Sequence, residues 1–357
     1  MTAAHIVFDI TGHGLGHGAM SAPVLEAIGA LRPDARITVR TSIPESWLRQ
    51  RIAARFDYIS QHEIGMAMSD GLAVDRVASF LRYRALHHDW PRAAGAAMEA
   101  LSPLKPDLVV SNIGYLSLMA AASLGVRGVA YSSLNWADVF FAYCADFPGA
   151  ETIRDQMAQA YGRAALFLQP APSMEMPSIA NGRPTAPVAR KGGDRADEIR
   201  AALGLATGTR LAVVSFGGIA AAVDYSLWPR WPAWRLLVGP DERPAHPDMT
   251  SIATLRMEFI DILASADVLV IKPGYGLITE AAVHGKAVLY TDREGWPETP
   301  AEIAWLSRHG RCAPLPADRL RAGDFQAEAE ALLALPAPPP PRADGARKIA
   351  LALLEGL

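Results

Sequence analysis

The sequence predicts an α/β protein made of two domains, each built on a parallel β-sheet. Short strands that are apolar at nearly every position alternate with helical segments along most of the chain. Strands of this kind are buried on both faces, as in parallel sheets covered by helices. A single proline-rich stretch interrupts the alternation, and a chain of 357 residues exceeds what one hydrophobic core usually supports. We therefore expect two α/β halves joined by a hinge.

The first half opens with a β-branched strand at residues 5–10, which ends in a glycine-rich run. A helix is expected at residues 22–31 and a second strand at 36–41. Further strands at 107–111 and 128–131 enclose a small-residue helix at 116–124. Strands and helices that alternate in this way are typical of βαβ units in a parallel sheet.

A proline-rich segment at residues 169–195 separates the two halves. It contains five prolines and then Lys191-Gly192-Gly193, a composition that marks a linker. After it we expect helices at 196–203, 257–265 and 277–285 and strands at 210–216, 235–238, 268–271 and 287–290. The predicted units are a first domain at 1–168, the linker at 169–195, a second domain at 196–334, and a proline-rich connector with a terminal helix at 335–357. The connector is expected to be extended, so that the terminal helix can pack back on the first domain.

Composition excludes several functional classes. The formal net charge is −3 and no block of basic residues stands out, so nucleic acid is not an expected partner. Cys144 and Cys312 are far apart and neither has metal-ligand spacing. We find no signal-peptide pattern and no apolar run near the ~20 residues of a membrane span. The expected location is the cytoplasm, and peripheral membrane contact stays open.

The first candidate site is the run from Thr11 to Gly18, TGHGLGHG, between a strand and a helix. Glycines such as Gly14 and Gly16 let the backbone turn sharply and approach a ligand. The run does not match a strict dinucleotide fingerprint, and no acidic residue ends the second strand. Its histidines, His13 and His17, can act as general bases toward an acceptor hydroxyl. The alternative is that they only cap the turn.

Two further glycine turns follow apolar strands in the second half. The stretch from Lys272 and Pro273 to Glu280 opens a helix whose backbone amides can meet a phosphate. Glu280 can present a carboxylate to a ribose diol, or it can be an ordinary acid near a helix start. The predicted nucleotide-binding residues are Gly217, Gly218, Lys272, Pro273, Gly274, Tyr275, Gly276 and Glu280.

The stretch at residues 267–298, DVLVIKPGYGLITEAAVHGKAVLYTDREGWPE, resembles the donor-nucleotide site of GT-B glycosyltransferases. It is similar to the peptidoglycan lipid-intermediate N-acetylglucosaminyltransferase and, more closely, to the glycosyltransferase-like N-terminal domain of L-arabinokinases. The glycine run at 12–18 and the Gly217-Gly218 turn fit the same relatives. The resemblance implies the GT-B fold, in which two Rossmann-like domains face each other across a cleft.

The resemblance also implies roles for single residues. His17 matches the family histidine that serves as a base or phosphate partner, and Glu280 matches the ribose-binding glutamate. The loop at 292–298 matches the sugar-recognition loop, which assigns Arg293, Glu294 and Glu298 to the sugar. Many family members have a glutamine where Glu298 stands, so the donor sugar is open. Asn112 and Asn135 follow strands of the first domain and are expected on the acceptor side of the cleft, with Gly14 and Gly16.

The predicted function is transfer of a sugar from a nucleotide-sugar, by preference a UDP-sugar, to an unidentified hydroxyl acceptor, with inversion and without a metal or cofactor. One alternative is a nucleotide-sugar 2-epimerase or hydrolase on the same fold, and another is a non-catalytic nucleotide-sugar-binding protein. Trp228, Trp231 and Trp234 are assigned to core packing rather than to an acceptor platform. The pair at 87–88, two histidines, is expected on a helix surface.

Overall fold

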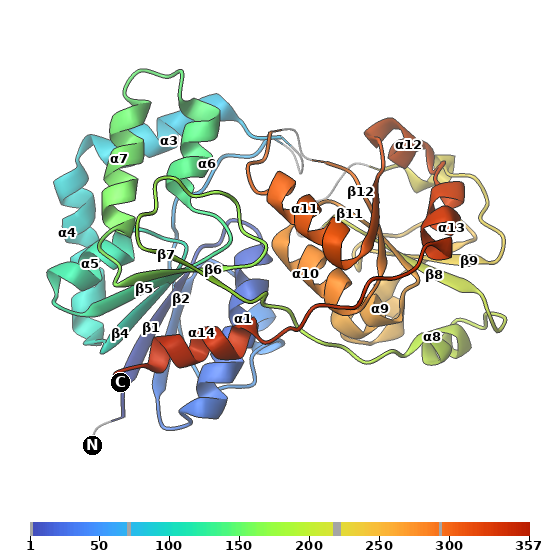
Figure 1. Cartoon of the computed structure of the whole chain (residues 1–357), viewed down its shortest axis with the longest axis horizontal. Coiled ribbons are helices and arrows are strands. Elements are labelled where there is room, and N and C mark those ends of the chain that lie inside the picture. The colour runs from blue at the N-terminus through green and yellow to red at the C-terminus, as the bar shows by residue number, and fades with distance from the viewer. Residues whose placement is uncertain (1–2, 70–72, 217–222, 293–294) are drawn as a thin grey trace.

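The computed structural model contains two β-sheets, one in each half of the chain (Figure 1). It describes residues 3–69, 73–216, 223–292 and 295–357. The strands of the first sheet are β1 (His5–Ile10), β2 (Arg36–Thr41), β3 (Asp57–Ser60), β4 (Leu108–Asn112), β5 (Arg127–Tyr131), β6 (Leu166–Pro170) and β7 (Gly182–Thr185). The strands of the second are β8 (Arg210–Ser215), β9 (Trp234–Val238), β10 (Met249–Ser251), β11 (Val268–Ile271), β12 (Ala287–Tyr290) and β13 (Arg311–Pro314).

Both sheets are parallel and have the central crossover of a doubly wound fold. The first has the strand order β3-β2-β1-β4-β5-β6-β7 and the second β10-β9-β8-β11-β12-β13. Each reverses direction next to its first strand, β1 or β8, and ligands bind at the carboxyl ends of the strands at such a point. The predicted class, two Rossmann-like α/β halves, is confirmed.

Helices cover both faces of each sheet. In the first half they are α1 (Gly16–Leu31), α2 (Glu45–Arg49), α3 (Arg76–His88), α4 (Trp90–Leu101), α5 (Leu116–Ser123), α6 (Trp136–Cys144) and α7 (Ala150–Tyr161). In the second half they are α8 (Ala196–Ala202), α9 (Phe259–Ser265), α10 (Tyr275–Val283), α11 (Thr299–His309), α12 (Ala317–Ala322) and α13 (Gln326–Ala334), and α14 (Gly345–Leu354) ends the chain. Separate apolar clusters lie on opposite faces of each sheet, so each half has its own core.

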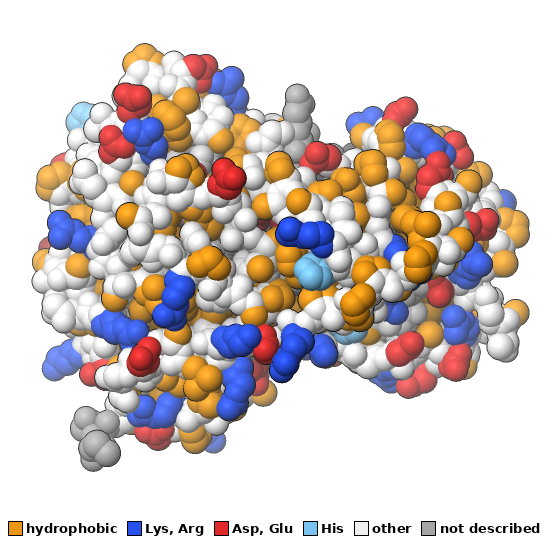
Figure 2. Space-filling model, in the orientation of Figure 1, with side chains coloured by type: hydrophobic (Ala, Val, Ile, Leu, Met, Phe, Trp, Pro, Cys, Tyr) orange, Lys and Arg blue, Asp and Glu red, His pale blue; other side chains and the backbone are white. Residues whose placement is uncertain are grey.

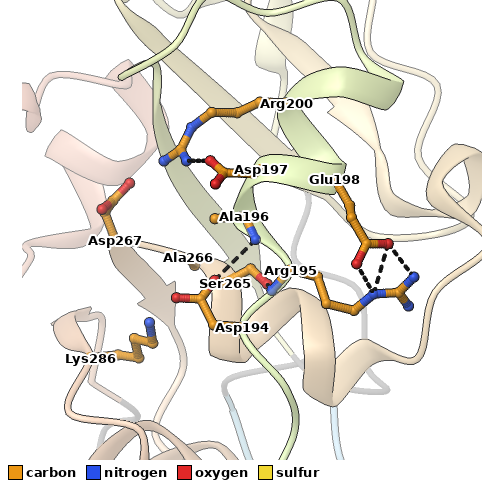
Figure 3. Close-up of a pocket in the computed structure, with 10 residues that line it drawn as sticks. All are labelled: Asp194, Arg195, Ala196, Asp197, Glu198, Arg200, Ser265, Ala266, Asp267 and Lys286. Atoms are coloured by element: carbon orange, nitrogen blue, oxygen red, sulfur yellow. Dashed lines mark hydrogen bonds and ion pairs between the residues drawn. The ribbon is translucent and has the colours of Figure 1, made fainter.

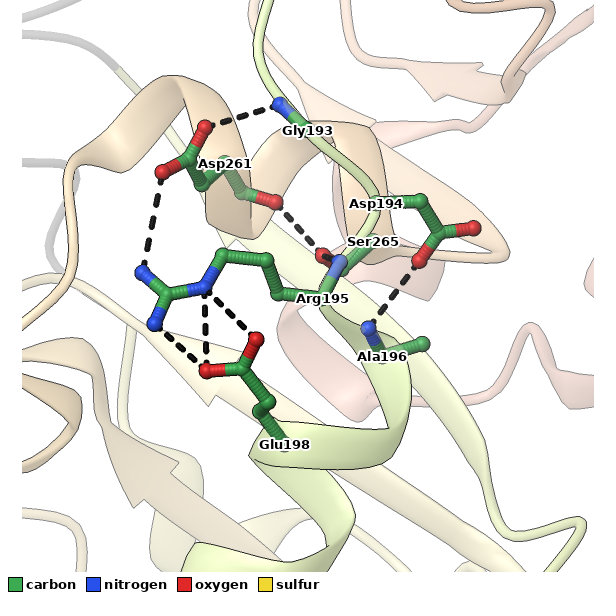
Figure 4. Close-up of polar contacts among 7 residues, drawn as sticks. All are labelled: Gly193, Asp194, Arg195, Ala196, Glu198, Asp261 and Ser265. Atoms are coloured by element: carbon green, nitrogen blue, oxygen red, sulfur yellow. Dashed lines mark hydrogen bonds and ion pairs between the residues drawn. The ribbon is translucent and has the colours of Figure 1, made fainter.

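The segment predicted as a linker contributes to the first sheet before it crosses to the second half. Strand β7 lies inside residues 169–195 and pairs with β6 along the sheet edge. The far end of the segment is held on α9 by two backbone hydrogen bonds, from Gly193 N–H to Asp261 Oδ1 at 2.9 Å and from Arg195 N–H to Ser265 Oγ at 2.7 Å (Figure 4). The guanidinium of Arg195 also pairs with Glu198 and Asp261. The connection is therefore anchored on α9.

The terminal helix returns to the first half, as predicted. The chain crosses back after α13, and α14 packs beside α1 (Figure 1). Ile349 and Leu353 of α14 are fully buried in the core under the first sheet. The guanidinium of Arg127 donates to the carbonyls of Leu353 at 3.0 Å and Ala352 at 3.1 Å, which satisfies acceptors at the end of the helix.

The tryptophan cluster of the second half is confirmed as core. Trp228, Trp231 and Trp234 are each at most 4% exposed, and Phe325 packs edge-on against two of them. The expectation that His87 lies on a helix surface is wrong. Its ring is buried between Gln156 and Tyr115, with hydrogen bonds of 2.7 and 2.9 Å, because residues 80, 83 and 87 form the inward face of α3.

The surface agrees with the even charge balance of the sequence. On the face in Figure 2, acidic side chains are interspersed with basic ones over both halves. No helix in the described part of the chain is both long and apolar enough to cross a membrane.

Candidate active site

The glycine run after β1 lies at the carboxyl end of the first sheet. Gly14 has φ +74°, a left-handed conformation that favours glycine, and a Cβ on Gly14 or Gly16 would meet open space. Helix α1 begins at Gly16, earlier than the predicted start at 22. His17 therefore lies in the first turn of α1, at the edge of the sheet where ligands bind.

The His17 ring is held by the residue that ends β4. Its Nδ1 lies 2.8 Å from Asn112 Oδ1, and the two side chains are 7% and 0% exposed. The amide nitrogen of Asn112 is directed at the Met20 sulfur, 3.3 Å away, so its oxygen accepts from Nδ1–H. This bond fixes the tautomer of His17 and leaves Nε2 with its lone pair to accept a proton.

Burial keeps this imidazole neutral. Desolvation lowers the pKa of His17 to about 4, opposed by its hydrogen bond to Asn112 and assisted by nearby His13. Above about pH 5 the ring is thus in its basic form. Asn112 carries no charge and so orients the ring without the added basicity that a carboxylate would give.

His13 is held in a different way. Its Nε2 lies 3.1 Å from the Met66 carbonyl oxygen, and its ring meets Trp136 edge-on at a centroid distance of 5.1 Å. The ring is also parallel, within 2°, to that of Trp296, with centroids 6.2 Å apart. Trp296 belongs to the second half, so His13 lies at the contact between the halves. Both predicted bases therefore lie at this end of the first sheet, with His17 held by Asn112 and His13 beside Trp296.

The turn before α10 faces this loop from the second half. Lys272, Pro273 and Gly274 connect β11 to α10, and a Cβ on Gly274 would meet open space. A Cβ on Gly276 would lie 3.8 Å from that of Ala19 in α1, so the first turns of α1 and α10 are in contact. The structure brings the two predicted glycine turns together.

Tyr275 joins the two halves. Its hydroxyl accepts from the Val188 N–H at 2.9 Å and donates to the Ala171 carbonyl at 3.1 Å. The side chain is 6% exposed and packs into the core of the first half. The ring and hydroxyl of Tyr275 therefore contact other residues of the protein. Its backbone amide lies at the start of α10, where a ligand could bind.

Glu280 lies in the second turn of α10, partly buried between basic groups. Burial raises the pKa of its carboxyl to about 7, against the opposing effects of Arg190, Arg51 and the Arg190 backbone. Arg51 comes from the first half, where its guanidinium lies 3.9 Å from the centre of the Trp47 ring. Sequence reasoning did not identify Arg51 or Arg190, because their approach to Glu280 depends on how the two halves pack.

The loop after β12 lies between the second half and the residues of the first half that form the candidate site. Glu298 is 4% exposed, and the Trp296 indole N–H donates to its carboxylate at 3.4 Å. Trp296 also approaches Tyr143 of α6. Four predicted residues, Arg293, Glu294, Gly217 and Gly218, lie outside the described residues. Trp296 was not predicted as a site residue. In the sequence, only its position within the stretch that resembles the sugar-recognition loop indicated that it could lie in the site.

Asn135 lies at the same sheet edge but acts within its own helix. Its side-chain oxygen accepts from the Asp138 N–H at 2.9 Å, and its amide donates to the Asp138 carboxylate at 2.7 Å. It is the N-cap of α6, and it is fully buried. These bonds fix the start of α6 and, with it, the neighbouring Trp136 beside both histidines.

Two hollows differ in their relation to the site. One, of about 540 Å³, is lined by Asp194, Asp267 and Lys286 among others (Figure 3). Asp267 and Lys286 directly precede β11 and β12, so this hollow lies at the amino ends of the strands, away from the site. The other, of about 560 Å³, is lined by Phe141, Met174 and Pro297 among others, from both halves. It lies at the carboxyl ends, beside the contact of Trp296 with the first half.

The chain has the GT-B fold, which glycosyltransferases share. The calicheamicin glycosyltransferase CalG4 superposes with a TM-score of 0.61 at 15% identity, covering 99% of this chain and 94% of that one. MurG of Acinetobacter baumannii gives 0.56 at 13%, covering 99% of each chain. A UDP-N-acetylglucosamine 2-epimerase gives 0.57 at 12%, covering 99% and 96%.

By sequence, the chain is similar to the L-arabinokinase of Arabidopsis thaliana. The two are 26% identical over 307 residues, which is 84% of this chain. The chain spans 29% of the length of that relative. A comparison with models of known protein families gives no match. The predicted resemblance to GT-B glycosyltransferases and to L-arabinokinase is thereby confirmed.

Proposed function

We propose that this protein transfers a sugar from a nucleotide-sugar to a hydroxyl acceptor. The proposal is supported by the place of His17 in the first turn of α1, two residues before Ala19, which contacts Gly276 of α10. Asn112 holds one ring nitrogen of His17 at 2.8 Å, which leaves Nε2 as a base. Across the contact, the backbone at Gly274 borders open space at a helix start, where an anionic diphosphate is favoured.

The donor would lie on the second half. Backbone amides near Gly274 and Gly276 and the cation of Lys272 offset the diphosphate charge, so the proposal includes no metal. Glu280 receives the ribose diol, and the loop that carries Glu298 contacts the sugar. Gly217, Gly218, Arg293 and Glu294 retain their proposed roles at the diphosphate and the sugar. A UDP-sugar is the first donor to test.

The proposed reaction takes place between an acceptor bound on the first half and a donor bound on the second half. An acceptor bound on the first half loses its hydroxyl proton to His17 Nε2, and its oxygen attacks the anomeric carbon. The bond from that carbon to the diphosphate oxygen breaks, and the nucleoside diphosphate leaves. Attack from the face opposite the leaving group inverts the anomeric centre. The hollow of about 560 Å³ beside Trp296 is the proposed entry for the acceptor.

The test begins with the donor. A thermal-shift screen over UDP-, GDP-, dTDP- and CMP-sugars identifies the nucleotide, because a ligand at ~100-fold excess over its dissociation constant stabilises a protein by a few kcal/mol. The selected donor is then incubated with an acceptor panel. His17→Ala should lose most of the transfer and still bind the nucleotide. Full activity of this variant would refute the assignment of the base.

A nucleotide-sugar 2-epimerase is the second candidate, because such an enzyme shares the fold over nearly the whole chain. An epimerase or hydrolase converts the donor with no acceptor present. Incubation with donor alone therefore separates the two candidates: a new sugar product supports the epimerase or hydrolase, and an unchanged donor excludes both.

A further inference from the structure

A carboxyl group lies beneath the loop that presents Asn112 to His17. Glu63 follows β3, and its Oε2 is buried and has no hydrogen-bond partner. The carboxyl packs against Gly114: a Cβ on that glycine would lie 2.0 Å from Glu63 Oε1 and 2.3 Å from Oε2. No other residue type at position 114 would leave room for the carboxyl group.

The loop above Glu63, residues 111–115, is held at several points. The Thr11 N–H donates to the Asn112 carbonyl at 2.8 Å, and the Tyr161 hydroxyl donates to the Ile113 carbonyl at 2.6 Å. The Ser111 hydroxyl donates to the Gly114 carbonyl. Glu63 packs against the same loop from the opposite side. If its carboxyl group moves, we expect the loop and Asn112 to move with it.

The segment that carries Glu63 also reaches the second histidine. The Met66 carbonyl bonds His13 at 3.1 Å, and a Cβ on Gly65 would lie 2.8 Å from the His13 ring. Both histidines thus depend on the same short segment, residues 63–66, through different contacts.

The charges around Glu63 favour its neutral form. Asp9 of β1 and Arg40 of β2 form a buried ion pair with two bonds of 2.7 and 2.8 Å, so the guanidinium of Arg40 is already paired with another carboxylate. The hydroxyl groups of three tyrosines face the same region from α3, the loop and α7: Tyr83, Tyr115 and Tyr161. Burial, with the Asp9 charge adding to it, raises the pKa of Glu63 to about 8, and Arg40 opposes this shift.

We propose that Glu63 is a positioning residue that works as an uncharged acid. In that form it lets the 111–115 loop close down and hold Asn112 against His17. When it ionises, the repulsion from Asp9 and the need of the carboxylate for water push the loop outward, and the His17 ring loses its anchor. This inference rests on the proposed role of His17 in transfer.

The test compares the natural protein with Glu63→Gln, which keeps the shape of the neutral acid, and with Glu99→Gln as a matched control on the exposed face of α4. The first readout needs no substrate. Trp136 lies against both histidines, at centroid distances of 5.1 and 6.1 Å, so tryptophan fluorescence is followed from about pH 6 to 9.5, below ordinary tyrosine ionisation. The natural protein and Glu99→Gln should show a transition near pH 8, and Glu63→Gln should not.

The second readout is sugar transfer over the same pH range. One ionisation near pH 8 lowers the active fraction about tenfold between pH 7 and pH 9. The natural protein and Glu99→Gln should lose that factor, and Glu63→Gln should keep its rate at pH 9. A KM that changes little while kcat falls would place the effect on the base rather than on binding.

Two results would overturn the proposal. One is a fluorescence signal of the natural protein that stays flat through pH 8, which needs no variant to fold. The other is a transition of the same size in folded Glu63→Gln. If no donor or acceptor supports turnover, the proposed function fails by itself, and the fluorescence titration still decides the role of Glu63.

Discussion

The hydrogen bond between Asn112 and His17 gives a prediction that can be worked out from the structure. Asn112→Ala removes the acceptor from a buried Nδ1–H and leaves it without a partner, which costs about 1–3 kcal/mol of stability. The ring is then free to change tautomer and orientation. Transfer should fall by about tenfold or more, up to the 10²–10⁴ that a positioned base contributes.

Asn112→Asp separates orientation from charge. The substituted carboxylate accepts the same hydrogen bond and adds a negative charge beside the ring. An opposite charge within ~4–6 Å shifts a pKa by 1–3 units, so the pKa of His17 should rise from about 4 to roughly 5–7. The acidic limb of the activity profile should move to higher pH by the same amount.

Nuclear magnetic resonance of the histidine rings measures this without a substrate. Nine histidines are present, and His17→Gln identifies the resonance of interest by its absence. His246 is a suitable internal control, because it is buried in the second half against the Trp228 carbonyl. The chemical shifts of its ring nitrogens should be the same in every variant at a given pH.

The role of Asn112 is refuted if His17 titrates at the same pH in the natural protein and in Asn112→Asp. It is also refuted if Asn112→Ala retains the full transfer rate. Either result would mean that the 2.8 Å contact does not control the base.

Three further predictions follow from the same contacts. Burial lowers the pKa of His17 to about 4 in the folded protein, so below about pH 6.5 the unfolded chain binds a proton on this histidine that the folded chain does not bind. The free energy of unfolding should therefore be highest above about pH 6.5 and should fall by up to about 3 kcal/mol toward pH 4. Urea unfolding should show this loss, and an unchanged acid dependence in His17→Gln would contradict it. Glu280, with its pKa near 7, should bind a ribose better as the carboxylate, so nucleotide affinity should rise between about pH 6 and 8 and fall about tenfold in Glu280→Gln; calorimetric titrations that give equal affinities at both pH values would argue against this role. Tyr275→Phe leaves the buried Val188 N–H without its partner and should lower the free energy of unfolding by about 1–3 kcal/mol; an unaltered melting temperature would show that this contact between the halves contributes little.

The regular elements could be predicted where apolar patterning is strong. Strands such as β1 and β11 are wholly buried and read clearly from their residues. Strand β7 was predicted as linker because it contains Pro184, which a central strand excludes and an edge strand tolerates. The early start of α1 at Gly16 was not predicted, because its first turn contains two glycines, which have low helix propensity.

The candidate site was predictable to the extent that strand ends could be located. The rule that ligands bind at the carboxyl ends of parallel strands placed His17 and Asn112 at that edge of the first sheet and Gly274 at that edge of the second. It could not rank His17 above His13, because the difference depends on which carbonyl or amide each ring meets. Glu63 could not be identified from the sequence, because its proposed role depends on its contact with Gly114, a residue distant along the chain.

In the proposed function, a nucleotide-sugar bound at the start of α10 lies near the imidazole of His17. The most direct test adds UDP, or whichever nucleotide stabilises the protein, and follows the ring nitrogen resonances of His17 and His246. We expect the His17 Nε2 resonance to shift until the nucleotide site is saturated and the His246 resonances to stay unchanged. Saturating binding, shown by thermal stabilisation, with an unmoved His17 resonance would contradict it.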